Sequence, residues 1–313
     1  MRTPILPPRK ASRATKRKRQ NLTLGEYTDR YFSSRDCTEG YKQDSRARIE
    51  CFIQWYGCDP RIKVLTCDVA NEWLSALMGT GLAPVTVDNY RRALRVVWMF
   101  AYMEGDAPDP PFRLKKIRVR RQASVEAYTH DEIGKLLTAA KALVGYFPNG
   151  VKRCMFWKTA ISAAYSTGLR RHDLLVLNRS EIAADGMALV VMHKTGYRVA
   201  VRFSDEAMEG IRTMAGIVEN DERAIPWPHH ENALPRQFRA LTRRAGVTRG
   251  SWKWLRRSCG SYAEAANPGT GYRALGHRSL QVFNGHYNDE KITVAKPVSP
   301  PPLLPDQAEG GVA

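Results

Sequence analysis

The chain has 313 residues and carries 49 lysines and arginines against 31 acidic residues, for a formal net charge of +18. This length allows about two domains, and a hydrophobic content of 43% is enough to build their cores. A globular chain this basic typically binds a polyanion, with nucleic acid as the first candidate. No apolar run approaches the roughly 20 residues of a membrane span, and the N-terminus lacks the apolar core of a signal peptide. We therefore expect a cytoplasmic protein without a membrane partner.

Residues 1–20 are predicted to form a disordered basic arm, because they contain eight lysines and arginines and no acidic residue. This arm either lies along DNA phosphates or only aids solubility. Residues 21–106 then predict a small helical domain. Thr23 and Glu26 have capping-box spacing, and apolar residues repeat at helical intervals over 24–32, 45–57, 68–79 and 84–105. The last of these helices would present a basic face for binding DNA, formed by Arg91, Arg92 and Arg95.

Residues 107–124 are interpreted as an extended basic linker between two domains. Three prolines in this region stop the preceding helix. Six cations follow, and a segment of this kind can track a nucleic-acid backbone. They are Arg113, Lys115, Lys116, Arg118, Arg120 and Arg121.

Residues 125–296 predict a second domain. Thr129 and Glu132 form another capping box, and helices are expected at 152–166, 231–245, 252–266, 270–275 and 279–286. The stretch "MALVVMHKTGYRVAVRF" predicts a β-hairpin that turns at Lys194-Thr195-Gly196. Residues 297–313 are rich in proline and glycine and are predicted to be a disordered tail. The expected fold class is therefore mainly α with a small antiparallel β-sheet (α+β).

The six cysteines include no C-x-x-C pair, and His229-His230 have no further metal-ligand pattern around them. We therefore expect free thiols and no metal site.

Five motifs of the second domain follow one another in a characteristic order: "TGLRRHDLL", "HKTG", "KWLRRS", "LGHRSL" and "GHY". Together with the helical domain and basic linker ahead of them, they resemble the tyrosine recombinases, the integrase family of phages and mobile elements. The resemblance runs from residue 21 to the region of residue 290. It implies a helical core-type DNA-binding domain followed by a tyrosine-recombinase catalytic domain.

The resemblance also implies a reaction. A tyrosine oxygen attacks the scissile phosphate and forms a 3′-phosphotyrosyl bond with release of a 5′-hydroxyl, and another 5′-hydroxyl reverses the step. The bond energy stays in the covalent intermediate, so no ATP, metal or other cofactor is expected. Preorganised cations can stabilise the charge that builds on the phosphate oxygens, and arginine suits this role because its planar fork holds two oxygens.

The first arginine position of the family falls on Arg170. Arg171 is its rival, and we expect it to be a solvated or backbone-contacting neighbour that cleavage hardly needs. Asp173 stands one helical turn after Arg170 and can brace its guanidinium. Lys194, on the hairpin turn, is by resemblance the general acid that protonates the leaving 5′-oxygen, with Arg198 as an alternative cation.

The second arginine position falls on Arg256, with Arg257 as the adjacent rival. Lys253 stands where the family usually has histidine; it can donate to the phosphate but is a poor general base. His277 is then the candidate for proton transfer or for a hydrogen bond to the phosphate. Tyr287, ten residues further on, is the expected nucleophile.

The implied partners are double-stranded DNA, three further copies of the chain in a homotetramer on two DNA sites, and accessory DNA-bending proteins, all on the nucleoid. Two alternatives remain open: a non-catalytic or architectural DNA-binding protein on the same fold, and strand relaxation of the type IB topoisomerase kind. The target sequence, and the choice between integration, excision, inversion and resolution, cannot be predicted from these residues.

Overall fold

The computed structural model describes residues 21–119, 125–247 and 249–293. The chain divides into two compact units, residues 1–121 and 122–313, each with its own hydrophobic core. The expected basic arm, the expected tail, and Arg120 and Arg121 lie outside the described residues. No described helix is both long and apolar enough to cross a lipid bilayer.

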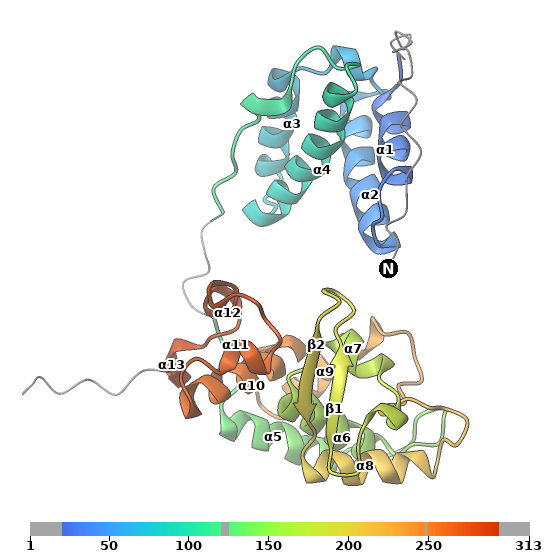
Figure 1. The fold of residues 1–313 in the computed structure, drawn as a ribbon, viewed down its shortest axis with the longest axis vertical. Helices are drawn as coiled ribbons and strands as arrows, with labels where there is room; N and C mark the ends of the chain where they lie inside the picture. Colours follow the sequence, from blue (N-terminus) through green and yellow to red (C-terminus); the bar gives the residue numbers. More distant parts are fainter. Residues whose placement is uncertain (1–20, 120–124, 248, 294–313) are drawn as a thin grey trace, which may run out of the picture. The chain divides into compact units, whose positions relative to one another are not determined.

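The first unit is a bundle of helices α1 (Leu24–Ser33), α2 (Glu39–Tyr56), α3 (Cys67–Gly79) and α4 (Pro84–Met103) (Figure 1). The predicted capping box is present: the Glu26 N–H donates to Thr23 Oγ1 at 3.2 Å, and the Thr23 N–H donates to Glu26 Oε2 at 2.8 Å. Helix α2 begins six residues earlier than the sequence pattern indicates, because the Thr38 side chain caps it. The core is rich in aromatic side chains, including Tyr27, Phe52, Trp73 and Trp98.

Residues 107–117, which belong to the predicted linker, pack against this first unit. Ala107 and Leu114 are buried in its core. The Trp98 Nε1–H donates to the Asp109 carbonyl at 2.9 Å. Asn71 accepts a hydrogen bond from the Lys115 N–H at 2.7 Å and donates to the Arg113 carbonyl at 3.2 Å. This half of the segment is therefore a folded strap, with a short 3-10 turn at Pro111–Arg113.

The second unit surrounds its core with α5 (His130–Lys141), α6 (Arg153–Thr167), α8 (Asp205–Ala215), α9 (Ala233–Arg244) and α10 (Trp252–Ala266). The predicted capping box of α5 is present at Thr129 and Glu132. Helix α8, which is not among the predicted helices, begins after Ser204, whose side chain caps it. Short helices complete the unit: α7 (Arg171–Val176), α11 (Gly271–Ala274), α12 (Leu280–His286) and α13 (Glu290–Thr293).

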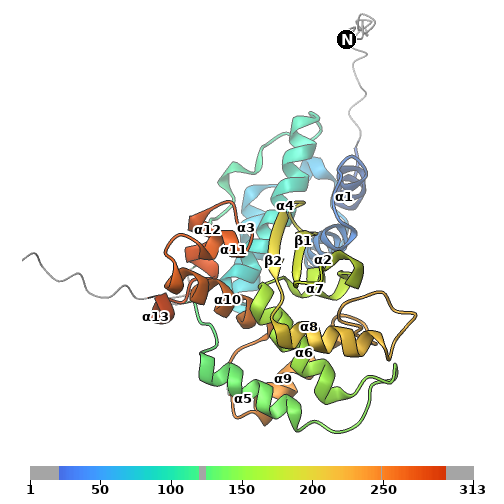
Figure 2. The same ribbon diagram turned by 60° about the horizontal axis from the view of Figure 1, so that its bottom comes forward.

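The predicted hairpin consists of β1 (Met187–Val191) and β2 (Arg198–Arg202), which pair antiparallel with Val190 opposite Val199. Alternate residues of both strands are buried. Helices α11 and α13 pack on α10, and α11 also contacts β2 (Figure 2). The prediction of a mainly α fold with a small antiparallel sheet is confirmed, and this packing brings the ends of α7, β1, α10 and α12 close together.

Candidate functional site

A cavity of about 370 Å³ lies in the second unit, where the start of α7, the hairpin turn, the first turns of α10 and the end of α12 meet. Five of the six predicted catalytic residues line it, and the sixth, His277, lies behind Arg256. The lining residues are Leu169, Arg170, Arg171, Lys194, Pro235, Ser251, Trp252, Lys253, Arg256 and Tyr287.

Arg170 and Asp173 face each other across the first turn of α7. The Arg170 Nη1 atom lies 3.9 Å from Asp173 Oδ2, and the Asp173 side chain is only 2% exposed. The other carboxylate oxygen of Asp173 accepts a hydrogen bond from the backbone N–H of His193 at 2.9 Å. Asp173 therefore lies at ion-pair distance from Arg170 without a hydrogen bond to it, and it holds the hairpin turn that carries Lys194.

Arg171 was expected to be a solvated or backbone-contacting neighbour, but the structure places it in the cavity lining. It lines the same cavity as Arg170, and its side chain is 30% exposed, with Nη2 3.9 Å from Glu231 Oε1. Its Nε atom is buried without a hydrogen-bond partner. Both arginines line the cavity from the short turn that leads from Gly168, the C-cap of α6, into α7.

Arg256 is the buried centre of the site, with 4% of its surface exposed. Its guanidinium donates to the carbonyls of Gly168 and, at 2.6 Å, Leu275, and to His277 Nε2 at 3.1 Å. The rival Arg257 has a different function: it donates to the carbonyls of His286 and Glu126, both at 3.1 Å. Arg256 is therefore the arginine that faces the cavity, and Arg257 ties together two chain segments.

His277 is held as a neutral imidazole. Burial, followed by the positive charges of Arg256 and Arg170, lowers the pKa of His277 to about 4. An arginine can only donate, so His277 Nε2 accepts and its proton resides on Nδ1. With Nε2 occupied in this way, the imidazole orients Arg256 rather than facing Tyr287 as a free base.

Tyr287 ends α12 with its ring over the cations of the site. The ring centroid lies 4.4 Å from that of His277, 5.1 Å from Lys253 Nζ and 5.3 Å from Arg256 Cζ. Burial raises the pKa of Tyr287, but the charges of Arg256, Lys253 and Arg170 outweigh it and the net pKa is lowered. Burial also lowers the pKa of Lys253, and the nearby cations Arg257, Lys194 and Arg256 add to this effect.

The backbone around Tyr287 is fixed by Ser261 and Asp289, which no sequence motif marks. Ser261 is fully buried; its hydroxyl donates to the Tyr287 carbonyl at 3.1 Å and accepts from the Asp289 N–H at 2.9 Å. Asp289 Oδ2 accepts from the Ala127 N–H at 2.8 Å, close to the start of the second unit. The tyrosine is thus anchored to the same unit that carries the arginines.

Unsatisfied polar atoms concentrate at this cavity. Among the described residues, seven buried side-chain nitrogen or oxygen atoms lack a hydrogen-bond partner, and five of them belong to the site. Buried donors without partners are costly and rare in native structures. Three of the five are nitrogens of arginines that line the cavity, so an anion with several oxygens, such as a phosphodiester, would satisfy these three. The five are Arg170 Nη1, Arg171 Nε, Asp173 Oδ2, Arg256 Nε and His277 Nδ1.

The predicted basic face of the first unit is organised by Asp88, a buried carboxylate with 5% exposure. Arg91 Nη2 lies 2.8 Å from Asp88 Oδ1 and Arg92 Nε lies 2.7 Å from Asp88 Oδ2. Together with Arg95, these arginines line two grooves of about 510 and 520 Å³. Three strap cations, Arg113, Lys115 and Lys116, are exposed, as is Arg118 directly after the strap.

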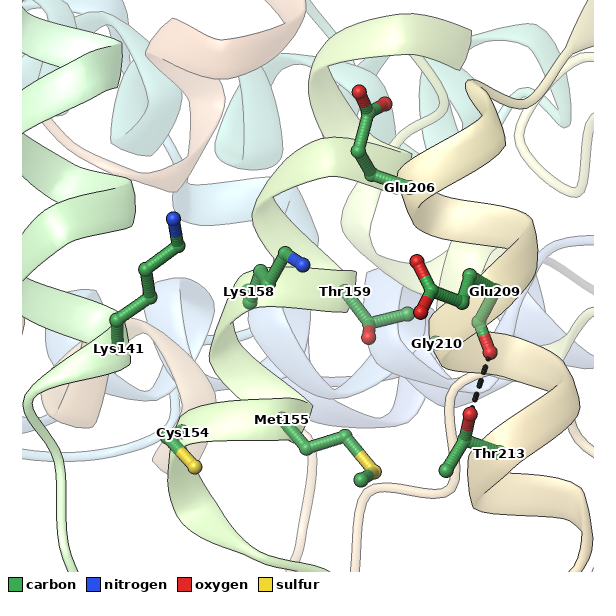
Figure 3. Close-up of a pocket in the computed structure, with 9 residues that line it drawn as sticks. All are labelled: Lys141, Cys154, Met155, Lys158, Thr159, Glu206, Glu209, Gly210 and Thr213. Atoms are coloured by element: carbon green, nitrogen blue, oxygen red, sulfur yellow. Dashed lines mark hydrogen bonds between the residues drawn. The ribbon is translucent and has the colours of Figure 1, made fainter.

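A separate cavity of about 230 Å³ lies against α5, α6 and α8, and none of the predicted catalytic residues lines it (Figure 3). Lys141 and Lys158 reach it from α5 and α6, and Glu206 and Glu209 from α8. Within the described part of the chain, no group of three or more histidine, cysteine, aspartate or glutamate side chains is placed to hold a metal ion.

The fold is that of the integrases. The chain superposes on a λ integrase dimer bound to a COC′ core site with a TM-score of 0.69 and 20% identity, over 86% of this chain and 78% of that one. A Tn1549 transposon integrase (residues 82–397) in complex with circular intermediate DNA gives a TM-score of 0.66 at 15% identity, over 87% and 98% of the two chains.

The sequence assigns the chain to a protein family. The profile of the phage integrase family matches residues 126–292, more than half of the chain, and the protein belongs to this family of tyrosine recombinases. Two proteins named tyrosine recombinase XerD are similar to it. That of Rhizobium meliloti (strain 1021) is 24% identical over 191 residues, and that of Caulobacter vibrioides is 30% identical over 165. These matches cover 58% and 51% of this chain, and they span 61% and 52% of the two relatives.

Proposed function

We propose that the protein is a site-specific DNA recombinase that cleaves and rejoins DNA strands through a 3′-phosphotyrosyl intermediate. The observation that carries the proposal is Tyr287, a tyrosine of lowered pKa in a cavity walled by Arg170, Lys253 and Arg256. These cations favour ionisation of the tyrosine nucleophile. They also stabilise the negative charge of a pentacoordinate phosphate.

In the proposed step, Tyr287 first loses its proton to solvent, its phenolate oxygen then attacks the phosphorus, and the bond from phosphorus to the 5′-oxygen breaks. Lys194, exposed on the hairpin turn at the cavity wall, gives its proton to that leaving oxygen. Arg170, Arg256 and Lys253 bind the non-bridging oxygens. His277 acts through Arg256, which it orients from behind, and Asp173 acts through Arg170. The reverse attack by a 5′-hydroxyl restores the tyrosine and rejoins the strands.

We further propose that double-stranded DNA is bound by both units. In the first unit, Asp88 holds two arginines of α4 in fixed positions, which favours a defined contact with DNA over a diffuse one. Recombination exchanges strands between two DNA sites, so four copies of the chain are expected on them, and accessory DNA-bending proteins are further candidate partners. A solved neighbour is a λ integrase tetramer bound to a Holliday junction, of which this chain covers 78% at 21% identity.

The direct test is capture of the covalent intermediate on a nicked suicide site taken from the DNA that flanks the gene, with EDTA present. Wild type should give an adduct that survives SDS. Tyr287→Phe should give none while still binding the DNA. Tyr146→Phe is the matched control, because it removes the same hydroxyl from a residue that is 62% exposed and does not line the cavity.

The other outcomes identify the alternatives. An adduct with Tyr287→Phe would show that another residue is the nucleophile. Binding of the flanking DNA without an adduct by wild type would favour a non-catalytic DNA-binding protein. Relaxation of any supercoiled plasmid, without preference for the flanking site, would favour a topoisomerase-like activity.

A further inference from the structure

A carboxylate outside the predicted catalytic set bonds to the start of α7. Glu231 lies in the turn before α9, and its Oε2 accepts a hydrogen bond from His172 Nδ1 at 3.0 Å. Its Oε1 lies 3.9 Å from Arg171 Nη2. The hydrogen bond from His172 lowers the pKa of Glu231, so this carboxylate is charged at neutral pH. Glu231 therefore fixes two side chains that directly follow Arg170.

The same contact extends to the hairpin turn. The His172 ring packs on the ring of His193, with the centroids 4.6 Å apart and the planes tilted by 59°. His193 directly precedes Lys194, and its backbone N–H donates to Asp173. The turn is thus held twice: by its backbone through Asp173, and by the His193 ring through His172.

Lys194 depends on this support for its position. Within the described residues, no hydrogen bond or ion pair of its own side chain fixes the ammonium group, and the residue is exposed. The backbone of the turn therefore sets where this flexible side chain starts and which positions its Nζ atom can reach. A proton donor must lie within hydrogen-bond reach of the leaving oxygen, so a small displacement of the turn is enough to slow proton transfer.

We propose that Glu231 is a positioning residue for Lys194, acting through His172 and His193. The proposal rests on the proposed function, in which Lys194 protonates the leaving 5′-oxygen. It assigns to Glu231 a selective effect on leaving-group departure, carried by the 3.0 Å hydrogen bond with His172 rather than by the longer 3.9 Å contact with Arg171.

The test separates leaving-group protonation from every other part of the reaction. Sulfur is placed at the bridging 5′ position of the scissile phosphate in a suicide DNA site. A thiol has a pKa of about 8.5, far below that of an alcohol, so the sulfur leaves as a thiolate without a proton donor. A variant that has lost only the position of its general acid is slow on the oxygen site and normal on the sulfur site.

Cleavage rates are measured at saturating protein for Glu231→Gln and His193→Ala on both sites. Each variant should lose about tenfold on the oxygen site, the scale of one charge-assisted hydrogen bond, and stay within about twofold of wild type on the sulfur site. The double variant should be no slower than either single one, because both act through the same contact. His193→Phe keeps a ring against His172 and should retain most of the rate.

Two control variants set the upper and lower limits of the expected loss in cleavage rate. Lys194→Ala should show the same selective loss in its strongest form. Glu219→Gln makes the same chemical change on an exposed surface and should equal wild type on both sites. An equal loss on the two sites, or no loss on the oxygen site, would overturn the role given to Glu231. Failure of wild type to cleave either site would instead overturn the proposed recombinase function, and the positioning role with it.

Discussion

The guanidinium of Arg256 donates a hydrogen bond to the backbone carbonyl of Gly168, a residue 88 positions earlier in the chain. Gly168 ends α6 and leads directly into Arg170, so this bond sets the second arginine of the site against the first. The same guanidinium also bonds to Leu275 and His277. One buried arginine therefore connects its own motif, "KWLRRS", to "TGLRRHDLL" and "LGHRSL". The geometry of the cavity depends on these hydrogen bonds.

Gly168→Ala should damage both stability and cleavage. Gly168 has φ +60°, where a side chain costs about 1–2 kcal/mol. An added Cβ would also lie 2.6 Å from Leu275 Cδ2 and 2.9 Å from Cys259 Sγ, and such overpacking costs about 1–3 kcal/mol more. Urea unfolding and adduct formation measure the two effects.

Gly246→Ala is the matched control for this substitution. Gly246 has φ +68° in the same unit, but an added Cβ would meet no atom within 4 Å. The Gly246→Ala variant should lose only the stability that a side chain at positive φ costs, and it should cleave DNA normally. Equal losses of stability in the two variants would show that the contacts of Gly168 with Leu275 and Cys259 do not matter.

Lys253→Met should slow cleavage in a manner that depends on pH. Lys253 is one of the cations that lower the pKa of Tyr287, so its removal raises that pKa and leaves less phenolate near neutral pH. The defect should be largest near pH 7 and shrink as the pH rises and the tyrosine ionises unaided. Single-turnover adduct formation across this range is the measurement.

Lys291→Met, which removes an exposed lysine from α13, serves as the control for loss of a positive charge. It should follow the wild-type pH profile. A defect of Lys253→Met that is equal at every pH would mean that Lys253 contacts the phosphate without affecting the ionisation of Tyr287.

Arg170→Ala and Arg171→Ala should both slow cleavage, and Arg170→Ala should slow it more. Loss of one preorganised donor to a transition-state oxygen slows a reaction by about 10²–10³-fold, and this is expected for Arg170→Ala. The sequence alone suggested that Arg171→Ala would be nearly neutral, but Arg171 lines the same cavity with an unpaired Nε. A loss of about tenfold is expected, the scale of one hydrogen bond to a charged group. Adduct formation at saturating protein separates the two, and equal losses would contradict the ranking.

The features that the sequence predicts well have local causes. The capping boxes at Thr23 and Thr129 satisfy backbone N–H groups within four residues, and both are present. The hairpin turn at Lys194 depends on alternating apolar residues and on Gly196, which has φ +68°. The resemblance supplied the roles predicted for the five motifs, and the cavity brings five of the six predicted catalytic residues together.

The features that the sequence does not predict depend on partners far along the chain. Ser261 holds the backbone at Tyr287 and Asp289 from 26 and 28 residues away, and Glu231 reaches His172 over 59 residues. Residues 107–117 have the composition of a linker, yet they fold onto the first unit because Asn71 and Trp98 supply hydrogen bonds to their backbone. An unremarkable serine, glutamate or asparagine gives no pattern from which such a contact could be read.

His277→Gln should weaken the dependence of stability on pH. The folded state holds the pKa of His277 at about 4, whereas an unfolded histidine titrates near 6.5. Between these values the unfolded chain binds a proton that the folded chain does not, so acidification from about pH 6.5 toward pH 4 destabilises the wild type. Glutamine can still accept the hydrogen bond from Arg256 but does not titrate.

The fall in urea midpoint between pH 7 and pH 5 should therefore be smaller for His277→Gln than for the wild type. His286→Gln controls for loss of an exposed imidazole on the same segment. An unchanged fall for His277→Gln would mean that the imidazole takes up its proton in the folded state after all, and that it is free to act in proton transfer.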